Sequence, residues 1–475
     1  MAALEFDTAA LIDASVNASL IRVGAKLVLA YSGGVDSAIL AQGLASYAKL
    51  HPEYGYLLIH VHHGLSSNAD MWVAHCQRQA LHYQLPIEIV RVQVNTGPRL
   101  SIEAEARKVR YKAIKSLMDS GDLLLTGHHL DDQLETILLA LKRGLGPKGL
   151  SAMGAVQSFD GDKVLSRPLL SISREQIEAK AAHLGLQHIE DESNCDDKYD
   201  RNFLRLEIIP KLKSRWSAIA ATASRSAALC GQQQSVIDEE VSLRLPEFIE
   251  MVPYGNGTAL NLILFGQQKP NWQALLFRGY VEQLGFAPPS LVQLEQLLNQ
   301  LLCAKPDAKI ELKIGDMLVR RFNNRAYVFS INQEVIDQIS TSNIEVDVAL
   351  LLLMKDGSVT APNVIKADEL VISLSDSKKL IIVKEIVQDR VRMPLANEVL
   401  SIRCCVVGST RCRPHNRQHG RELKKLWQEY GVPPWERARV PLIFYDEKLV
   451  CAVGYWIEKS YLCDKDSEGL LFLAS

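Results

Sequence analysis

The sequence predicts an α/β protein in which a parallel sheet with helices on both faces is followed by two smaller domains, one mixed helical and hairpin, the other α+β. Apolar, strand-like runs alternate with helical patterns between about residues 20 and 205. At 475 residues, the chain is also too long for one ordinary core. The strand candidates are 27–30, 56–61, 87–92 and 123–126. The expected parts are a first domain at 1–215, a second at 216–332, a connecting segment at 333–380 and a C-terminal domain at 381–475.

The composition is that of a globular protein, with 47% hydrophobic and 23% charged residues. A formal net charge of −2 argues against indiscriminate nucleic-acid binding by the whole molecule but leaves local patches open. The amino terminus has no basic leader before an apolar core, and the apolar run at 348–354 is too short to span a bilayer, so we expect a cytoplasmic location. Nine cysteines without a Cys-x-x-Cys pair argue against both a disulfide framework and a zinc site.

The first chemical motif follows the strand at 26–31 directly, and a helical pattern continues from it. Paired glycines let the backbone turn closely around a ligand, and the unpaired N–H groups at a helix start attract phosphate. An ordinary turn between strand and helix would explain a bare glycine pair. A Walker-type loop would need Gly-Lys-Ser/Thr after the glycines, and Asp36 and Ser37 stand there instead. The candidate phosphate-binding residues are Ser32, Gly33, Gly34, Val35, Asp36 and Ser37.

This Ser-Gly-Gly-Val-Asp-Ser stretch resembles the pyrophosphate-loop motif of the PP-loop ATPases. Those enzymes cleave ATP between the α and β phosphates and activate a substrate by adenylation. The resemblance implies that the chain uses ATP and that its first domain has the Rossmann-like fold of the adenine nucleotide α-hydrolases. In such a fold the ligands lie beyond the carboxyl ends of the strands.

A second motif, Gly127-His128-His129-Leu130-Asp131-Asp132-Gln133-Leu134-Glu135, also reads as a loop that opens a helix. Asp132 and Glu135 are three residues apart and would share a helix face. Two acids there would stabilise a helix start through its dipole, or they would hold Mg²⁺ or accept the ammonium of an amine. The motif belongs to the same family as the loop, and this resemblance favours function. It implies that Asp36, Asp132 and Glu135 are catalytic, that Asp36 and Asp132 bind Mg²⁺, and that Gly127 and His128 contact the nucleotide.

Two further segments are candidate nucleotide contacts. Three histidines within residues 60–63 suggest a metal, but no carboxylate or thiolate of matching spacing accompanies them. In the PP-loop family this segment borders the adenine, which assigns His62 to that role. Residues 101–111 predict a helix capped by Ser101, with Arg107 and Arg110 on roughly one side. A solvated face would look the same, but the pattern Ala-Arg-x-x-Arg-Tyr resembles the family and implies contacts with ATP or an RNA backbone.

The acidic run at 188–200 lacks the alternation and glycine of a calcium-binding loop, so a solvated loop is the simpler interpretation. Its sequence, D-x-S-N followed by R-N-x-x-R, nevertheless resembles a signature of the tRNA(Ile)-lysidine synthetases within the PP-loop group. The matching residues are Asp191, Ser193, Asn194, Arg201, Asn202 and Arg205. By this resemblance we expect tRNA contacts at Asn194, Arg201, Asn202 and Arg205. Arg143 is expected near the substrate nucleotide, although helix dipoles alone favour basic residues at that place.

The rest of the chain predicts an RNA-contacting module and a basic domain. Helical patterns cover 217–240, 272–284 and 291–302, and a small sheet is expected at 310–314, 317–322 and 326–329. Residues 403–439 contain nine Lys and Arg residues but only three Glu residues, and Trp427 and Trp435 are interspersed among them. This balance indicates a surface that contacts a phosphate backbone, although a basic solvated helix would look similar. The segment resembles the C-terminal tRNA-binding domain of lysidine synthetases, with Arg421, Lys424 and Lys425 as candidate contacts.

Together the resemblances imply an ATP- and Mg²⁺-dependent ligase. It would join free lysine to the wobble cytidine of the CAU-anticodon isoleucine tRNA through an adenylated base. One alternative is a PP-loop tRNA thiolase, but those enzymes generally carry Cys-x-x-Cys pairs, which are absent here. Another is a non-catalytic tRNA-binding protein, against which the three intact acids Asp36, Asp132 and Glu135 count. The sequence leaves open the oligomeric state, with a homodimer as one option, and how Asp132 divides its roles between metal and lysine.

Overall fold

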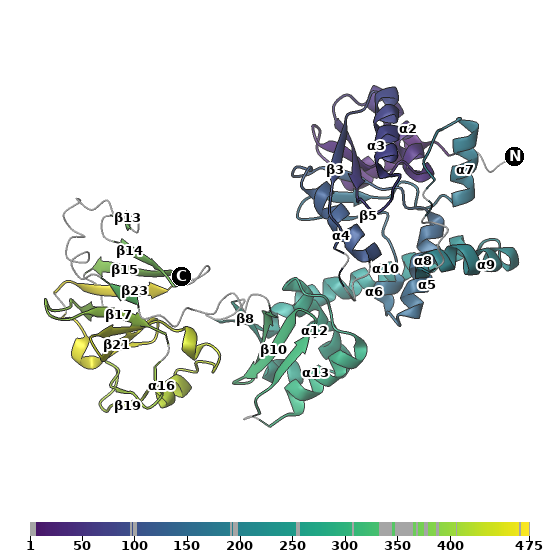
Figure 1. Cartoon of the computed structure of the whole chain (residues 1–475). Coiled ribbons are helices and arrows are strands. Elements are labelled where there is room, and N and C mark those ends of the chain that lie inside the picture. Colours follow the sequence, from purple (N-terminus) through teal and green to yellow (C-terminus); the bar gives the residue numbers. More distant parts are fainter. Residues whose placement is uncertain are drawn as a thin grey trace. The chain divides into compact units, whose positions relative to one another are not determined.

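The computed structural model divides into two compact units, Met1–Asp238 and Glu239–Ser475, and each is described by itself (Figure 1). The described residues are 6–95, 97, 102–190, 192, 198–252, 257–305, 308–331, 344–346, 364–366, 369–374, 379–385, 389–404, 406–464 and 467–474. Within them, no helix combines the length and the apolar character needed to cross a membrane.

The first unit alternates strands and helices, as the sequence predicts. Its elements are α1 (Thr8–Ser19), β1 (Lys26–Ala30), α2 (Val35–Leu50), β2 (Gly55–His62), α3 (Ala69–Tyr83), β3 (Ile87–Arg91), α4 (Ile102–Lys115), β4 (Leu123–Leu125), α5 (Leu130–Lys142), α6 (Pro147–Leu150), β5 (Val156–Ser158), β6 (Val164–Ser166), α7 (Arg174–His183), α8 (Asp200–Phe203), the π-helical turn η2 (Leu204–Ile208), α9 (Ile209–Arg215) and α10 (Ile219–Arg244), which runs into the second unit.

These strands form one sheet in the order β3-β2-β1-β4-β6-β5. All neighbours are parallel except β5, which pairs antiparallel with β6. The four predicted strands correspond to β1, β2, β3 and β4, and the fold class is confirmed. Because the chain moves outward from β1 to β3 and then returns to place β4 on the other side of β1, the order reverses between β1 and β4. Ligands of open parallel sheets bind at such a reversal.

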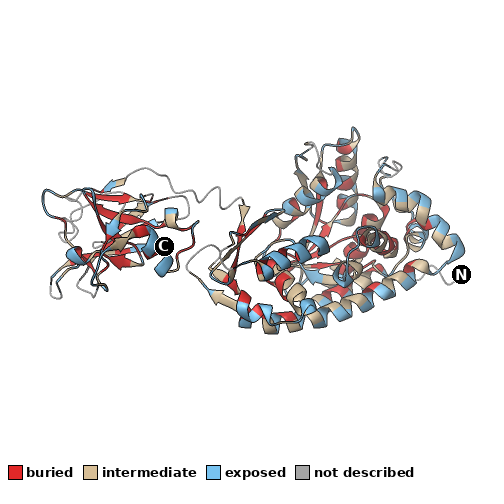
Figure 2. Ribbon diagram, turned by 90° about the horizontal axis from the view of Figure 1, so that it is seen from below, coloured by how far each residue is buried: buried red, intermediate tan, exposed pale blue. Residues whose placement is uncertain are grey.

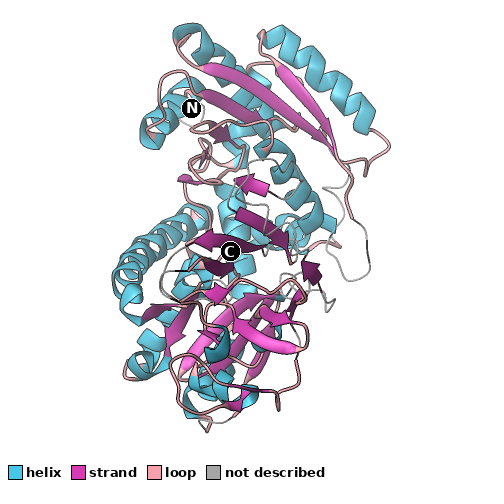
Figure 3. Ribbon diagram, turned by 90° about the vertical axis from the view of Figure 1, so that its left-hand side faces the viewer, coloured by secondary structure: helices cyan, strands magenta, loops and turns pink. Residues whose placement is uncertain are grey.

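Helices cover both faces of the sheet, because successive side chains of β1 pack into cores on opposite sides. Leu27 and Leu29 pack into a core with residues of α1, α2, α3 and α7, whereas Val28 packs with Ile114 and Met118 at and beyond the end of α4 on the opposite face. The three β1 side chains are fully buried, which is why the strand reads as a continuous apolar run. Figure 3 shows strands lying between helices in this part of the chain.

Helix α5 packs differently, because its apolar side chains face the segment that follows α8. Leu134 forms a small core with Ile209 of α9 and Ala220 of α10. Because of this packing, residues 200–209 lie beside α5, and arginines on α8 and η2 contact the acidic side chains of α5.

The second unit begins with the predicted helices and hairpins. It contains the 3₁₀ turn η3 (Leu245–Phe248), β7 (Ile249–Met251), β8 (Thr258–Asn261), α11 (Leu262–Gly266), α12 (Pro270–Gln283), α13 (Leu291–Cys303), β9 (Glu311–Ile314), β10 (Met317–Phe322) and β11 (Arg325–Ser330). The predicted three-stranded sheet is present, and β8 and β7 extend it beside β11.

The last part of the chain is rich in strands. Its elements are β12 (Ile344–Val346), β13 (Val364–Lys366), β14 (Glu369–Ser373), β15 (Lys379–Glu385), β16 (Val391–Arg392), β17 (Leu400–Arg403), β18 (Arg411–Cys412), β19 (Arg421–Glu422), α16 (Leu423–Glu429), η4 (Arg437–Arg439), β20 (Leu442–Tyr445), β21 (Lys448–Ala452), β22 (Trp456–Ile457), η5 (Lys459–Tyr461) and β23 (Gly469–Ala474). Figure 2 shows its buried residues concentrated in these strands.

Strands of the predicted connecting segment, 333–380, belong to these sheets. Strand β12 pairs with β17, and β14 pairs with β15, which in turn pairs with β23 at the end of the chain. The segment therefore supplies strands to the C-terminal part as well as connecting it. The exact four-part division remains a prediction.

Candidate active site

The loop between β1 and α2 is closed by the side chain of Ser37. Its Oγ accepts a hydrogen bond from the Gly33 N–H at 3.0 Å and donates one to the Gly34 carbonyl at 2.9 Å. The Ser32 hydroxyl lies 3.2 Å from the Ser37 hydroxyl. Gly34 is the N-cap of α2 and makes no side-chain cap, so the helix start is open toward a ligand.

Gly33 has a φ of +87°, and its carbonyl accepts a hydrogen bond from the Ile189 N–H at 2.9 Å. A Cβ at this position would overlap the Ile189 side chain and lie 3.0 Å from Cys76 Sγ. The glycine is therefore required both by the backbone conformation and by the close approach of the chain near residue 189.

We expect Gly33→Ala to destabilise the first unit more than Gly24→Ala does. Gly24 has the same φ of +87° but no atom within 4 Å of its would-be Cβ. Both variants carry the left-handed strain of about 1–2 kcal/mol, and only Gly33→Ala adds overpacking, which costs a further ~1–3 kcal/mol. Denaturant unfolding of both variants measures the difference. Equal losses would show that the contact with Ile189 and Cys76 relaxes freely.

The loop after β4 closes against the start of α2. A Cβ on Gly127 would lie 3.1 Å from Asp36 Cβ and 3.3 Å from the Ser37 nitrogen. The two motifs are therefore in backbone contact at the reversal between β1 and β4. This contact gives Gly127 a packing role, and the predicted contact with a nucleotide stays a prediction.

His129 links the two predicted metal-binding acids. It caps α5: Asp132 Oδ2 accepts from the His129 N–H at 2.9 Å, and His129 Nδ1 accepts from the Asp132 N–H at 3.4 Å. Because Nδ1 is an acceptor, the proton of a neutral imidazole lies on Nε2. That nitrogen is 3.8 Å from Asp36 Oδ1 and 3.5 Å from Asp132 Oδ2.

Arginines hold the three candidate catalytic acids. Arg174, the first residue of α7, donates to Asp36 Oδ2 at 2.7 Å. Arg205 donates to both oxygens of Glu135, at 2.9 and 3.2 Å, and to Asp132 Oδ1 at 3.4 Å. Arg201 Nε lies 3.3 Å from Glu135 Oε2. Two arginines predicted to contact tRNA are thus counterions of the acids on α5.

Burial is the largest cause of the pKa shifts of Asp36 and Glu135. It raises the pKa of Asp36, and the neighbouring His129 and Arg174 oppose that shift. Burial likewise raises the pKa of Glu135, with Arg205 opposing it. Glu135 is fully buried, Asp131 is 6% exposed and Asp132 is 9% exposed, so Asp132 is the most accessible of the three acids on α5.

One oxygen of this cluster is free to take a ligand. Asp36 Oδ1 is buried and has no hydrogen-bond partner within the described part of the chain. A carboxylate oxygen of this kind is a donor that Mg²⁺ prefers. The described residues hold no group of three His, Cys, Asp or Glu side chains spaced for a metal, so further ligands would come from a nucleotide and water.

The remaining predicted nucleotide contacts lie at the neighbouring strand ends and on α4. His62 Nε2, at the end of β2, is 3.3 Å from Arg91 Nη1. Arg110 donates to His63 Nε2 at 3.2 Å, and the Arg107 guanidinium lies 5.2 Å from the centre of the Tyr111 ring. His128, after β4, shares a 2.9 Å hydrogen bond with the Thr126 hydroxyl, and burial lowers its pKa to about 3. His128 is therefore neutral at pH 7.

The other predicted tRNA contacts of the first unit are dispersed. Arg143 is the exposed C-cap of α5, and Asn202 is half-buried on α8. Asp191, Ser193 and Asn194 lie outside the described residues.

The site also contains residues that sequence reasoning did not single out. His129 is one, since the motif drew attention only to its neighbours, and Arg174, the first residue of α7, is another. Asp131 joins these elements: its Oδ2 accepts from the Arg174 N–H at 2.8 Å, and it forms an ion pair with Lys213 of α9. Asp131 thereby fixes the positions of α7 and α9 relative to α5.

Some basic side chains of the predicted tRNA-binding surface in the C-terminal part form ion pairs with acidic residues. Arg421 forms an ion pair with Glu429, and Lys425 lies 3.8 Å from Glu422. Lys424 is exposed on α16 and makes no ion pair with a described residue. Trp427 is 4% exposed and belongs to a hydrophobic core, so it is unavailable for stacking on a base, contrary to the expectation of a surface aromatic residue.

Comparison with known proteins gives matches along most of the chain. Family models match a PP-loop domain at residues 8–212, a TilS substrate binding domain at 260–327 and a TilS substrate C-terminal domain at 400–473. The tRNA(Ile)-lysidine synthase of Shewanella woodyi is 66% identical over 98% of this chain and 96% of its own length. That of Shewanella oneidensis is 50% identical over 95% of each chain.

Among solved structures, the U34-tRNA thiolase NcsA of Methanococcus maripaludis is 19% identical, with a TM-score of 0.38, over 46% of this chain and 77% of its own. The matches to the family models and to the curated relatives confirm the resemblances inferred from the sequence.

Proposed function

The chain belongs to the tRNA(Ile)-lysidine synthase family, and on that premise we propose that it joins lysine to the wobble cytidine of the CAU-anticodon isoleucine tRNA. It is a ligase that uses ATP and acts on tRNA. The observation that carries the chemistry is the meeting of Asp36, His129 and Asp132 beside the open start of α2, at the reversal between β1 and β4.

In the first step the cytosine O2 attacks the α phosphorus of ATP. A new oxygen–phosphorus bond forms, the bond to the bridging oxygen breaks, and pyrophosphate leaves. The start of α2, at Val35, offers N–H groups to the departing phosphates. Arg174 and His129 hold Asp36 at this helix start. Mg²⁺ held by Asp36 and Asp132 together with the nucleotide would neutralise charge on the phosphates.

In the second step the ε-amine of lysine attacks C2 of the base, the C2–O bond breaks, and AMP leaves. The amine must lose a proton, which requires a nearby base. Asp132 suits this role because it is the most accessible of the three acids on α5. Glu135 contributes indirectly: it binds Arg201 and Arg205 and so holds both arginines beside α5.

The decisive experiment supplies the protein with ATP, labelled lysine and a CAU-anticodon isoleucine tRNA transcript. We expect alkali-stable label at the wobble base together with AMP and pyrophosphate. Label that is lost in mild alkali would indicate an aminoacyl ester, and absence of label would refute the proposal. The thiolase alternative has less support, because no Cys-x-x-Cys pair is present in the sequence.

We propose that the basic segment of the C-terminal part binds the tRNA backbone. The double variant Arg421→Glu/Lys424→Glu is expected to weaken tRNA binding and to reduce its logarithmic salt slope by about 1–2. Filter binding at several salt concentrations measures both quantities. Lys379→Glu/Lys448→Glu is the matched control, because it reverses two exposed charges outside residues 403–439. Equal affinities for both double variants would place the tRNA contacts elsewhere.

A cytoplasmic location and a homodimer remain proposals derived from the sequence. Analytical ultracentrifugation across a range of protein concentrations is expected to reveal a dimer. A concentration-independent monomer would refute it.

A further inference from the structure

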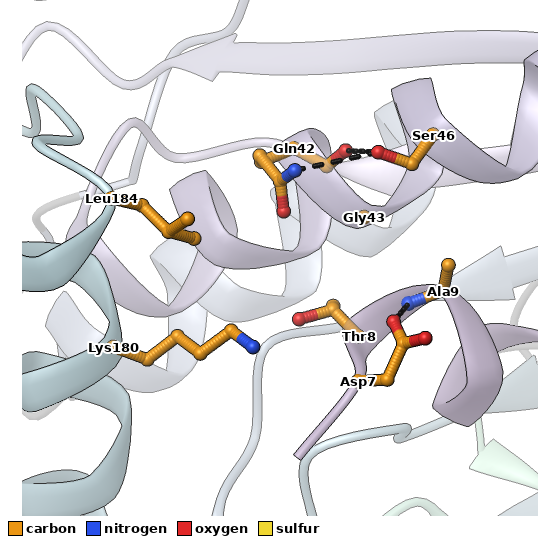
Figure 4. A pocket seen from close by; sticks show the side chains of 8 residues that line it. All are labelled: Asp7, Thr8, Ala9, Gln42, Gly43, Ser46, Lys180 and Leu184. Atoms are coloured by element: carbon orange, nitrogen blue, oxygen red, sulfur yellow. Dashed lines mark hydrogen bonds between the residues drawn. The ribbon is translucent and has the colours of Figure 1, made fainter. Parts of the chain in front are cut away.

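A small cavity lies between the start of α1, the middle of α2 and the second half of α7. Its volume is about 120 Å³. It is distinct from the loop at 32–37 and from the acids on α5, which do not line it. The lining residues are Asp7, Thr8, Ala9, Gln42, Gly43, Ser46, Lys180 and Leu184 (Figure 4).

A buried hydroxyl and an ammonium face this cavity. Thr8 is only 2% exposed, and its Oγ1 has no hydrogen-bond partner among the residues that the structure describes. Lys180 Nζ donates to the Phe6 carbonyl at 2.6 Å and forms no ion pair with a described acid. In Figure 4 the Thr8 hydroxyl and the Lys180 ammonium point toward the same space, whereas the Gln42 amide nitrogen donates to the Ser46 hydroxyl at 3.4 Å.

The geometry of α1 makes the cavity suitable for an anion. Thr8 is the first residue of this 12-residue helix, whose positive end therefore adds to the charge of Lys180. Asp7 is the acid among the lining residues, but its Oδ1 accepts from the Ala9 N–H at 2.9 Å as the helix cap. Figure 4 shows that carboxylate beside Ala9 and turned away from the Lys180 ammonium.

Leaving the Thr8 hydroxyl without a partner costs free energy, because a buried polar group that loses its water needs a replacement. A ligand that accepts from Thr8 and from Lys180 would supply it. We propose that this cavity binds a small oxyanion, a phosphate group or a carboxylate, with Lys180 as the cation and the hydroxyl of Thr8 as the donor.

Helices α2 and α7, which both line the cavity, also carry the Asp36–Arg174 ion pair. Gln42 lies six residues after Asp36 on α2, and Lys180 lies six residues after Arg174 on α7, which is about 9 Å along each helix. Thr8 packs closely on Gly43 of α2, so an oxyanion held between Lys180 and Thr8 would fasten α7 to the packed helices α1 and α2 about two turns away from the active site. The proposal itself concerns binding and does not depend on the ligase activity.

The test is a titration of the full-length protein with inorganic phosphate, and separately with acetate, at constant ionic strength. Methyl NMR of Thr8 and Ala9 reports on the cavity itself, so phosphate bound at the loop of residues 32–37 does not interfere. We expect saturable shifts with phosphate, with acetate or with both, and the more effective anion identifies the ligand class. No saturable shift with either anion would overturn the proposal.

Two substitutions localise the binding. Thr8→Val removes the hydroxyl and keeps the methyl group that packs on Gly43, where an added Cβ would overlap Thr8. Lys180→Met removes the charge, and Lys180→Arg restores it in case loss of the bond to Phe6 disturbs the fold. We expect the dissociation constant, followed at Ala9, to rise at least tenfold in the first two variants and to recover in Lys180→Arg.

Lys49→Met is the matched control, since it removes an exposed lysine near the end of α2, away from the cavity. It should bind as the unaltered protein does. Identical titrations for Thr8→Val, Lys180→Met and Lys49→Met would show that the anion binds elsewhere and would refute the site.

Discussion

Asp36→Asn is expected to abolish the formation of AMP and pyrophosphate, with the rate falling at least about 10²-fold, while tRNA binds with unchanged affinity. The substitution keeps the shape of the side chain. It removes the charge that faces Arg174 at 2.7 Å and the unpartnered oxygen that faces His129. Single-turnover assays of AMP release, together with filter binding of tRNA, separate the chemical step from binding.

Stability provides an internal check on Asp36→Asn. Burial raises the pKa of Asp36, so its charged form is disfavoured in the folded protein relative to the unfolded chain. The variant should therefore unfold at the same or a higher denaturant concentration near pH 7.

The matched control for Asp36→Asn is Asp119→Asn. Asp119 forms an ion pair of the same length, 2.7 Å, with Lys26, which begins β1 at the end of the strand opposite to the loop at 32–37. Normal activity is expected for the control. Normal activity of Asp36→Asn would remove Asp36 from the mechanism.

The framework of the first unit could be predicted because its signals are local. Strand β1 is buried on both faces and reads as an uninterrupted apolar run. Strands β1 and β4 are adjacent and parallel, so the two motifs that follow them lie side by side at the carboxyl ends of these strands. Family resemblance identified the motifs, and topology explains why they meet.

The ion pairs of the site could not be predicted, because they join residues far apart in the chain. Arg174 reaches Asp36 across 138 positions, and Arg205 reaches Glu135 across 70. The signature around Arg201 and Arg205 marked both as functional, but no pattern within the sequence names a counterion. His129 was missed for another reason: a histidine is an unusual helix cap, so its link between Asp36 and Asp132 has no local signal.

The strands within the predicted connecting segment could not be predicted from the sequence for a related reason. β12 and β13 have three residues each, and their pairing depends on partners elsewhere in the fold. Strand formation reflects packing against such neighbours more than intrinsic preference. β15, for example, pairs with β23 almost 100 residues later, in a register that joins Leu380 to Ala474.

Glu135→Gln is the second substitution with a large expected effect: it should lower ligase activity at least about 10²-fold without destabilising the protein. A carboxylate offers two oxygens, which accept from Arg205 at 2.9 and 3.2 Å while Arg201 lies at 3.3 Å. The amide offers one oxygen, so at least one guanidinium contact is lost. Steady-state kinetics with each substrate varied measure the effect, and Glu207→Gln, which breaks an exposed pair with Lys211, is the control.

The stability effect of Glu135→Gln follows from the sign of its pKa shift. Burial raises the pKa of Glu135 above its ordinary value of 4.5, so the folded protein holds this proton more tightly than the unfolded chain does. Stability therefore falls as pH rises through the window above 4.5, and the glutamine variant lacks this dependence. Denaturant unfolding across that window should show the unaltered protein losing stability relative to the variant as pH rises. The opposite trend would mean that Arg201 and Arg205 outweigh burial and that Glu135 holds the fold as well as the site.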